Sequence, residues 1–190
     1  AADLLSQAEH DKMASAVLVT DSRELAQAVS REIEAQLQTL EREEIARASI
    51  EANGKIIVAR SLTEAAAVAN RIAPEHLEIM TENPRALLPR IKNAGAVFLG
   101  AWSPEPLGDY LAGPDHVLPT SGTARFFSPL SVDSFLKTMS IIQYDKASLE
   151  PIRNDIIRLA EAEHLTAHAN SIRVRFEDVD GPADKGEGRA

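Results

Sequence analysis

The chain has 190 residues, of which 44% are hydrophobic and 26% are charged, a composition typical of a soluble globular protein. Its formal net charge of -9 argues against a nucleic-acid-binding protein, because such proteins usually present a basic surface. The sequence has no cysteine, no signal-peptide pattern and no apolar run near the ~20 residues of a membrane span. Disulfides and thiolate metal sites are therefore excluded, and a cytoplasmic location is favoured.

The first hundred residues alternate between helical and strand patterns. The expected strands cover residues 16–20, 55–59, 77–80 and 96–99. The expected helices cover residues 2–10, 22–53, 61–72 and 84–92. In the long helix, the side chains expected to face inward are Leu25, Val29, Ile33, Leu37 and Leu40. The alternation predicts an α/β fold with a mostly parallel sheet and flanking helices, an incomplete Rossmann-like arrangement.

Two polar pairs lie within this α/β pattern. Gln7 and His10 would share one face of the first helix, where they could bind one metal ion or simply form a polar surface. Glu75 and His76 stand at the end of a predicted strand, where they could act as acid and base or form an exposed polar pair. The turns between strands and helices contain no glycine-rich phosphate loop, so no nucleotide site of that kind is visible.

Residues 94–120 form the most unusual stretch of the chain. A short buried strand leads into a path so rich in proline and glycine that helix or central strand is not expected there. Asp109 and His116 lie within this path, which is typical of a functional segment that follows a strand. The alternative is a long surface connection whose polar side chains cap turns.

Helical patterns alone follow residue 130. Residues 131–144 carry an apolar stripe, residues 149–163 form a second helical pattern, and residues 165–174 a final helix or helix-to-strand piece with His168. We expect an α/β domain over residues 1–130 that holds most of the site. A helical segment over residues 131–178 and a disordered tail over residues 179–190 are expected to follow it.

Several short motifs together resemble the histidinol dehydrogenase family. They are SQAEHD, PEHLE, AGAVFLG, GDYLAGPDHVLPT and LTAH, in that order, and the resemblance runs from about residue 1 to about residue 175. It implies a homodimeric enzyme of histidine biosynthesis that oxidises L-histidinol to L-histidine through the aldehyde, in two NAD-dependent steps with zinc.

The resemblance also implies roles for particular residues. The zinc ligands would be Gln7, His10, Asp109 and His168. An amide oxygen, two imidazoles and a carboxylate suit a divalent ion, with positions left for substrate. The metal is expected to hold the substrate's imidazole and amine rather than to polarise the reacting oxygen.

The remaining residues of the set would act on the substrate. His76 would take the hydroxyl proton and Glu75 would activate water in the second step. His116 and Glu163 would contact the substrate, as would Gln7, His10, His76, Asp109 and His168. In the family the C-terminal helices cross to the partner subunit, so Glu163 and His168 would serve the other protomer's site.

The chain departs from the family in two ways. Asp115 stands where the family often has asparagine, which alters the local charge. The chain also has about half the family's length, so it is expected to be a fragment that lacks most of the NAD site and is inactive alone. Two other readings stay open: a related zinc- and NAD-dependent dehydrogenase of another amino alcohol or polyol, and a non-catalytic metal-binding or dimerisation module.

Overall fold

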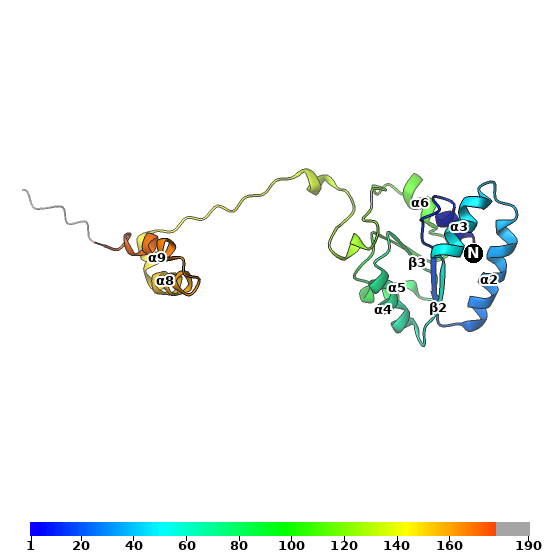
Figure 1. The fold of residues 1–190 in the computed structure, drawn as a ribbon, viewed down its shortest axis with the longest axis horizontal. Coiled ribbons are helices and arrows are strands. Elements are labelled where there is room, and N and C mark those ends of the chain that lie inside the picture. Colours follow the sequence, from blue (N-terminus) through cyan, green and yellow to red (C-terminus); the bar gives the residue numbers. More distant parts are fainter. Residues whose placement is uncertain (178–190) are drawn as a thin grey trace, which may run out of the picture. The chain divides into compact units, whose positions relative to one another are not determined.

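The computed structural model describes residues 1–177. The chain forms two compact units (Figure 1). Unit 1 covers Ala1–Leu136, and the described part of unit 2 covers residues 137–177. The tail predicted from residue 179 lies outside the described residues. Among residues 1–177, no helix combines the length and the apolar character that a membrane crossing requires.

Unit 1 contains four short strands that pair in parallel. β1 (Val17–Thr20) pairs with β2 (Lys55–Val58), and β3 (His76–Ile79) pairs with β4 (Ala96–Leu99). Helices connect the strands within each pair, as parallel pairing requires. The predicted α/β class with parallel strands and flanking helices is confirmed, although the strands form two two-stranded sheets.

Three α-helices of unit 1 begin at side chains that cap them, those of Ser22, Ser61 and Asn83. The bounds of the helices before β4 are α1 (Ala2–Ala8), α2 (Arg23–Leu37), α3 (Glu43–Asn53), α4 (Leu62–Ile72) and α5 (Pro84–Leu87), the last continued by η1 (Leu88–Arg90). The Ser22 hydroxyl accepts from the Leu25 N–H at 3.1 Å, and the Ser61 hydroxyl accepts from the Glu64 N–H at 3.3 Å. Each bond satisfies a backbone donor that the first turn leaves unpaired.

The predicted helix over residues 22–53 is wrong as a single element. The chain turns between α2 and α3, and the Thr39 hydroxyl donates to the Gln36 carbonyl at 2.9 Å within this turn. The turn lets α3 fold back, so that Ala46 reaches the same apolar cluster as Ile33 and Leu37. Tertiary packing therefore outweighs the continuous helical propensity of the segment.

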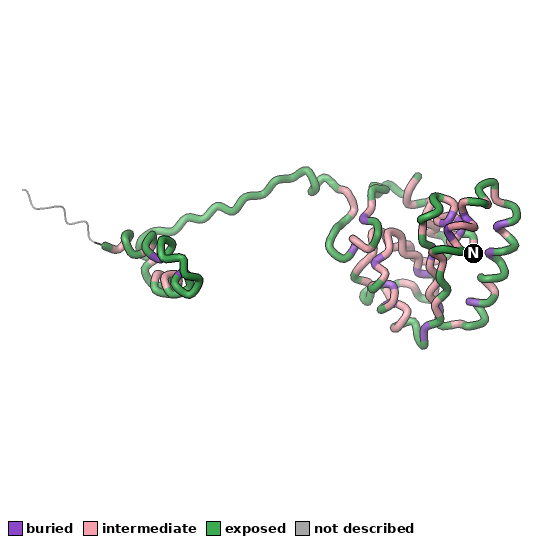
Figure 2. Tube along the Cα trace, in the orientation of Figure 1, coloured by how far each residue is buried: buried purple, intermediate pink, exposed green. Residues whose placement is uncertain are grey.

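A hydrophobic core cluster of unit 1 lies among α1, α2 and α3 (Figure 2). The buried members of this cluster are Leu5, Ala8, Ile33, Leu37 and Ala46. Val29 and Leu40 pack against the cluster, as expected, but the prediction that Leu25 faces inward is wrong. Leu25 lies in the first turn of α2 and is 48% exposed, so it is not part of this core.

Unit 2 is a helical hairpin. α7 (Lys146–Leu149) and η4 (Glu150–Ile152) lead into α8 (Arg153–Ala162), which packs against α9 (Thr166–Arg173). His164 has a φ of 60° in the turn between the two helices. The predicted helical C-terminal segment is thus present. The stretch over residues 165–174, predicted as a helix or a helix-to-strand piece, forms the helix α9.

The predicted helix over residues 131–144 is wrong. Only η3 (Val132–Phe135) is helical there, and residues 131–148 are exposed throughout (Figure 2). Phe135, Met139 and Ile142 form the apolar stripe of the pattern, yet each is more than three-quarters exposed. An amphipathic helix is stabilised mainly by packing of its apolar face, and within the described residues this stripe has no such packing.

Candidate active site

The candidate site lies where α6 packs on one face of the β3–β4 pair. In the parallel register His76 pairs with Ala96 and Glu78 with Phe98, so these side chains share one face. A turn through Gly100, at a φ of +84°, returns the chain to that face as α6 (Glu105–Tyr110). A Cβ on Gly108 would lie 2.6 Å from the Phe98 ring, so the glycine permits the close approach of α6.

Helix α6 corrects the expectation that residues 94–120 contain no helix. Pro104 is the N-cap residue and Pro106 lies in the first turn, where a missing N–H breaks no helical hydrogen bond. The prolines therefore start this helix rather than prevent it. Beyond α6 the path is irregular, as predicted.

Three polar side chains from two elements meet at this face. The His76 Nε2 lies 3.6 Å from the Asp109 Oδ1 and 3.8 Å from the Glu105 Oε1. The ligand atoms of all three residues lie within 4.8 Å of one another. The side chains are largely buried, with 13% of His76, 14% of Glu105 and 24% of Asp109 exposed. This group is called the His76 cluster below.

The imidazole of His76 is held between carboxylates and an aromatic ring. Its two nitrogens are buried and have no hydrogen-bond partner among the described residues. The Phe98 ring centroid lies 6.0 Å from the imidazole centroid. Buried polar atoms without partners cost free energy, and native proteins retain them mainly where function requires it.

Two carboxyl groups on this face, Glu105 and Glu78, have raised pKa values. Burial raises the pKa of Glu105, and the nearby Asp109 raises it further, whereas His76 and His10 lower it. Burial also raises the pKa of Glu78, against the effect of the Glu105 backbone N–H, which donates to the Glu78 Oε1 at 2.8 Å. Carboxyl groups perturbed by burial next to a histidine are typical of functional sites.

The structure brings some of the predicted site residues together. His76 and Asp109 are in contact, and His10, exposed just after α1, is near enough for its charge to act on Glu105. Gln7 is half-buried on α1. Glu75 is half-buried directly before β3, and its carbonyl accepts from the Ala96 N–H at 2.8 Å.

The other predicted residues lie outside the His76 cluster. His116 is exposed in the irregular path beyond α6. Glu163 is the C-cap of α8 and His168 lies on α9, both exposed and both in unit 2. The ligand set implied by the resemblance is therefore divided between the two units, with Gln7, His10 and Asp109 in unit 1.

Sequence reasoning missed two members of this site, Glu105 and Glu78. Glu105 lies one helical turn before Asp109, a relationship hidden because no helix was expected among the prolines. Glu78 lies two positions after His76 on β3, so strand alternation already placed both on one face. That second signal was available in the sequence.

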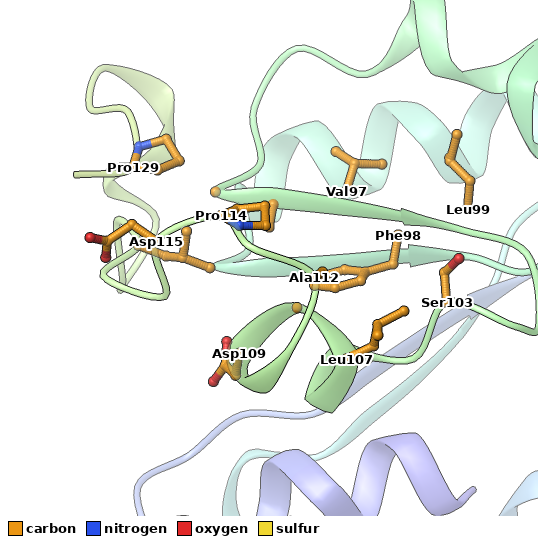
Figure 3. A pocket seen from close by; sticks show the side chains of 14 residues that line it. Val97, Phe98, Leu99, Ser103, Leu107, Asp109, Ala112, Pro114, Asp115 and Pro129 are labelled. Atoms are coloured by element: carbon orange, nitrogen blue, oxygen red, sulfur yellow. The ribbon is translucent and has the colours of Figure 1, made fainter. Parts of the chain in front are cut away.

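A cavity of about 510 Å³ adjoins the cluster (Figure 3). β4, α6 and the segment around Pro114 and Asp115 line it, and Asp109 belongs to both the cavity and the cluster. Its lining is mostly apolar, with few polar groups. Its volume falls within the range of small-molecule sites.

The polar side chains of this site suit a zinc ion, whereas the turns of the described residues do not suit the phosphates of a dinucleotide. Asp109 offers a carboxylate, and His10, whose charge acts on the neighbouring Glu105 carboxyl, offers an imidazole; both are donors that zinc accepts. A dinucleotide phosphate would need a glycine-rich turn before a helix. Among the turns that lead from a strand to a helix in residues 1–177, only the one before α6 contains a glycine, Gly100.

A family model described as histidinol dehydrogenase matches residues 1–176. The chain is similar to histidinol dehydrogenase of Caldanaerobacter subterraneus subsp. tengcongensis, with 65% identity over 93% of this chain and 41% of that protein. It is also similar to histidinol dehydrogenase of Geobacter metallireducens, with 55% identity over 100% of this chain and 42% of that protein. The chain thus spans about two-fifths of the length of the curated relatives it matches.

The fold is similar to that of a solved structure. The crystal structure of histidinol dehydrogenase from Elizabethkingia anophelis aligns with a TM-score of 0.78 and 38% identity. The alignment covers 95% of this chain and 41% of that one.

Proposed function

The chain belongs to the histidinol dehydrogenase family, and we propose that it supplies the metal-binding and acid–base part of an enzyme that oxidises L-histidinol to L-histidine. The reaction would pass through histidinal, use zinc and NAD, and belong to histidine biosynthesis. The observation that best supports this proposal is the 3.6 Å contact between the His76 Nε2 and the Asp109 Oδ1. It brings a candidate base beside a candidate metal ligand.

Zinc would be held by Gln7, His10 and Asp109 together with His168. When bound, it would fix the imidazole and amine of the substrate, and orientation of this kind can account for much of a reaction barrier. The charges of His10 and Asp109 both act on the pKa of the Glu105 carboxyl, which supports a shared site for these two ligands. His116 and Glu163 would contact the substrate.

His76 would accept the proton of the substrate hydroxyl. Neither of its nitrogens has a hydrogen-bond partner in residues 1–177, so no described group occupies them. Two carboxylates within 4 Å would stabilise the imidazolium that forms. Glu75, adjacent to His76 at the start of β3, would activate water for attack on the aldehyde.

NAD would bind outside this segment. The strand-to-helix turns of the described residues lack a glycine-rich phosphate loop, and the relatives have more than twice this chain's length. The 190 residues alone would therefore bind NAD weakly and turn over little or no L-histidinol. Addition of a chain that carries the rest of the family's length would restore the reaction.

A second copy of the chain would complete the site as a homodimer. Glu163 and His168 lie on the hairpin of unit 2, which follows an exposed stretch over residues 131–148. Leu136, Met139 and Ile141 are exposed apolar side chains in that stretch. Exposed apolar runs of this kind mark surfaces that a partner covers. We place the domain boundary near residue 130 and the exchanged segment after it.

A substrate panel tests the proposed function. A chain of full family length that contains this segment is loaded with zinc and assayed for NAD reduction with L-histidinol, other amino alcohols and small polyols. The proposal requires L-histidinol to be the preferred substrate and L-histidine to be the product. Preference for another alcohol would point to a related dehydrogenase. Zinc binding without any NAD reduction would point to a non-catalytic module.

A further inference from the structure

Helix α6 presents two carboxylates to the same nitrogen of His76. Asp109 and Glu105 lie one helical turn apart, and their oxygens are 3.6 Å and 3.8 Å from the Nε2. An imidazole N–H can make a good hydrogen bond with only one of them at a time. The two carboxylates therefore compete for one donor.

This inference rests on the proposed function, in which Asp109 binds zinc and Glu105 is left as the carboxylate available to His76. A carboxylate that coordinates zinc donates electron density to the metal, so Asp109 would be the weaker acceptor for the imidazole N–H. Glu105 is the other carboxylate within 4 Å of the Nε2 among the described residues. We propose that Glu105 is a positioning residue, whose carboxylate holds the His76 imidazole in the orientation that accepts the substrate's proton.

The position of Glu105 is fixed by the strand that carries His76. Glu105 is the first residue of α6. The preceding residue, Pro104, is the N-cap, and its side chain makes no capping hydrogen bond. The Glu105 N–H instead donates to the Glu78 Oε1 at 2.8 Å. Glu78 shares the face of β3 with His76, so one strand holds both the imidazole and the start of the helix that carries its partner.

The environment of Glu105 also suits a positioning role. Its side chain is only 14% exposed, so water competes little for the carboxylate. Phe98 lies beside the imidazole and limits its movement away from the carboxylates. The 3.8 Å separation exceeds hydrogen-bonding distance, and such contacts commonly shorten when substrate binds.

The experiment compares variants of the zinc-loaded, full-length enzyme. Glu105→Gln keeps the volume and an acceptor oxygen, whereas Glu105→Leu keeps the volume only. We expect kcat to fall about 10-fold in the first and about 100-fold in the second, the range found when partners of active groups are removed. The KM for L-histidinol and the zinc content should stay unchanged. Glu82→Gln, an exposed glutamate in the turn after β3, is the matched control.

Three results would overturn the inference. The first is an unchanged kcat in Glu105→Leu, and the second is a fall in kcat that matches a loss of zinc, which would make Glu105 a metal ligand. The third is an NMR result, which needs no activity: imidazole nitrogen signals of His76 that stay in place in Glu105→Leu, or that move equally in Glu82→Gln. If the wild-type enzyme is inactive but the His76 signals still move in Glu105→Leu, the proposed function is refuted while the contact between Glu105 and His76 is supported.

Discussion

The Nε2 of His76 lies 3.6 Å from the Oδ1 of Asp109, a contact that joins the start of β3 to the last turn of α6. The chain reaches this contact because it reverses after β4 and returns as a short helix across the same face. One residue of the pair is the proposed base and the other a proposed zinc ligand. The first two of the following predictions depend on this packing of α6.

Asp109→Asn should weaken zinc binding. The substitution keeps the shape of the side chain but removes the charge that attracts the metal, so we expect zinc affinity to fall by more than about 100-fold, beyond what loss of an outer-shell partner causes. Isothermal titration with zinc measures the effect. Asp115→Asn is the control, since Asp115 is an exposed aspartate of the same segment. Equal zinc affinity in both variants would exclude Asp109 as a ligand.

Gly108→Ala should loosen α6. An alanine normally favours a helix over glycine by about 1 kcal/mol. Here the added Cβ would meet two atoms of the Phe98 ring at 2.6 and 2.7 Å. We expect this overpacking to lower the free energy of unfolding by about 1–3 kcal/mol and to weaken zinc binding.

Phe98→Leu provides the control for that substitution, because leucine has no ring at this place. In a double-mutant cycle the two substitutions should be less harmful together than the sum of each alone. Additive effects in urea unfolding would show that Gly108 and Phe98 do not limit the approach of α6.

Leu37→Ala should be one of the most destabilising substitutions in unit 1. Leu37 is fully buried in the cluster of α1, α2 and α3, so its truncation leaves a cavity that costs about 2–5 kcal/mol. Leu25→Ala makes the same chemical change in the same helix at an exposed position and should cost less than about 1 kcal/mol. Equal losses in denaturant unfolding would contradict the core assignment.

The Arg60–Glu64 pair should give a measurable pH dependence. Hydrogen bonds from the Arg60 side chain and then from its backbone N–H lower the pKa of Glu64 to about 2. Because the folded pKa is depressed, the stabilisation is present above the ordinary value of 4.5 and is lost as the pH falls from 4.5 to about 2.

Arg60→Gln separates the two causes of this shift. Removal of the guanidinium should raise the pKa of Glu64, while the bond from the backbone N–H of residue 60 at 2.7 Å keeps it below 4.5. NMR titration of the Glu64 carboxyl carbon measures the value in both proteins. An unchanged pKa in the variant would show that the guanidinium is not the main cause.

Local signals in the sequence were sufficient for much of the fold. Ser22 and Ser61 cap the helices that begin near the predicted residues 22 and 61, because an N-cap bond depends only on residues of the same turn. The strands followed from short apolar runs. The break between α2 and α3 and the loss of helix after Phe135 could not be predicted, since both depend on what the apolar faces pack against.

The site was predicted in part for the same reason. His76 and Asp109 stand in motifs that resemble a family, and the structure brings them into contact. Glu105 was missed because proline was expected to prevent the helix that places it one turn from Asp109. The pairing of Glu78 with the Glu105 N–H is a long-range contact that no sequence period reveals.

The most direct test is the oxidation of L-histidinol by the zinc-loaded, full-length enzyme, compared between wild type and His76→Asn. We predict that the wild type forms L-histidine as NAD is reduced. In His76→Asn, kcat should fall by about 100- to 10,000-fold at unchanged zinc content, as expected for loss of a general base. A wild-type enzyme that forms no L-histidine, or a His76→Asn enzyme with unchanged kcat, would contradict the account.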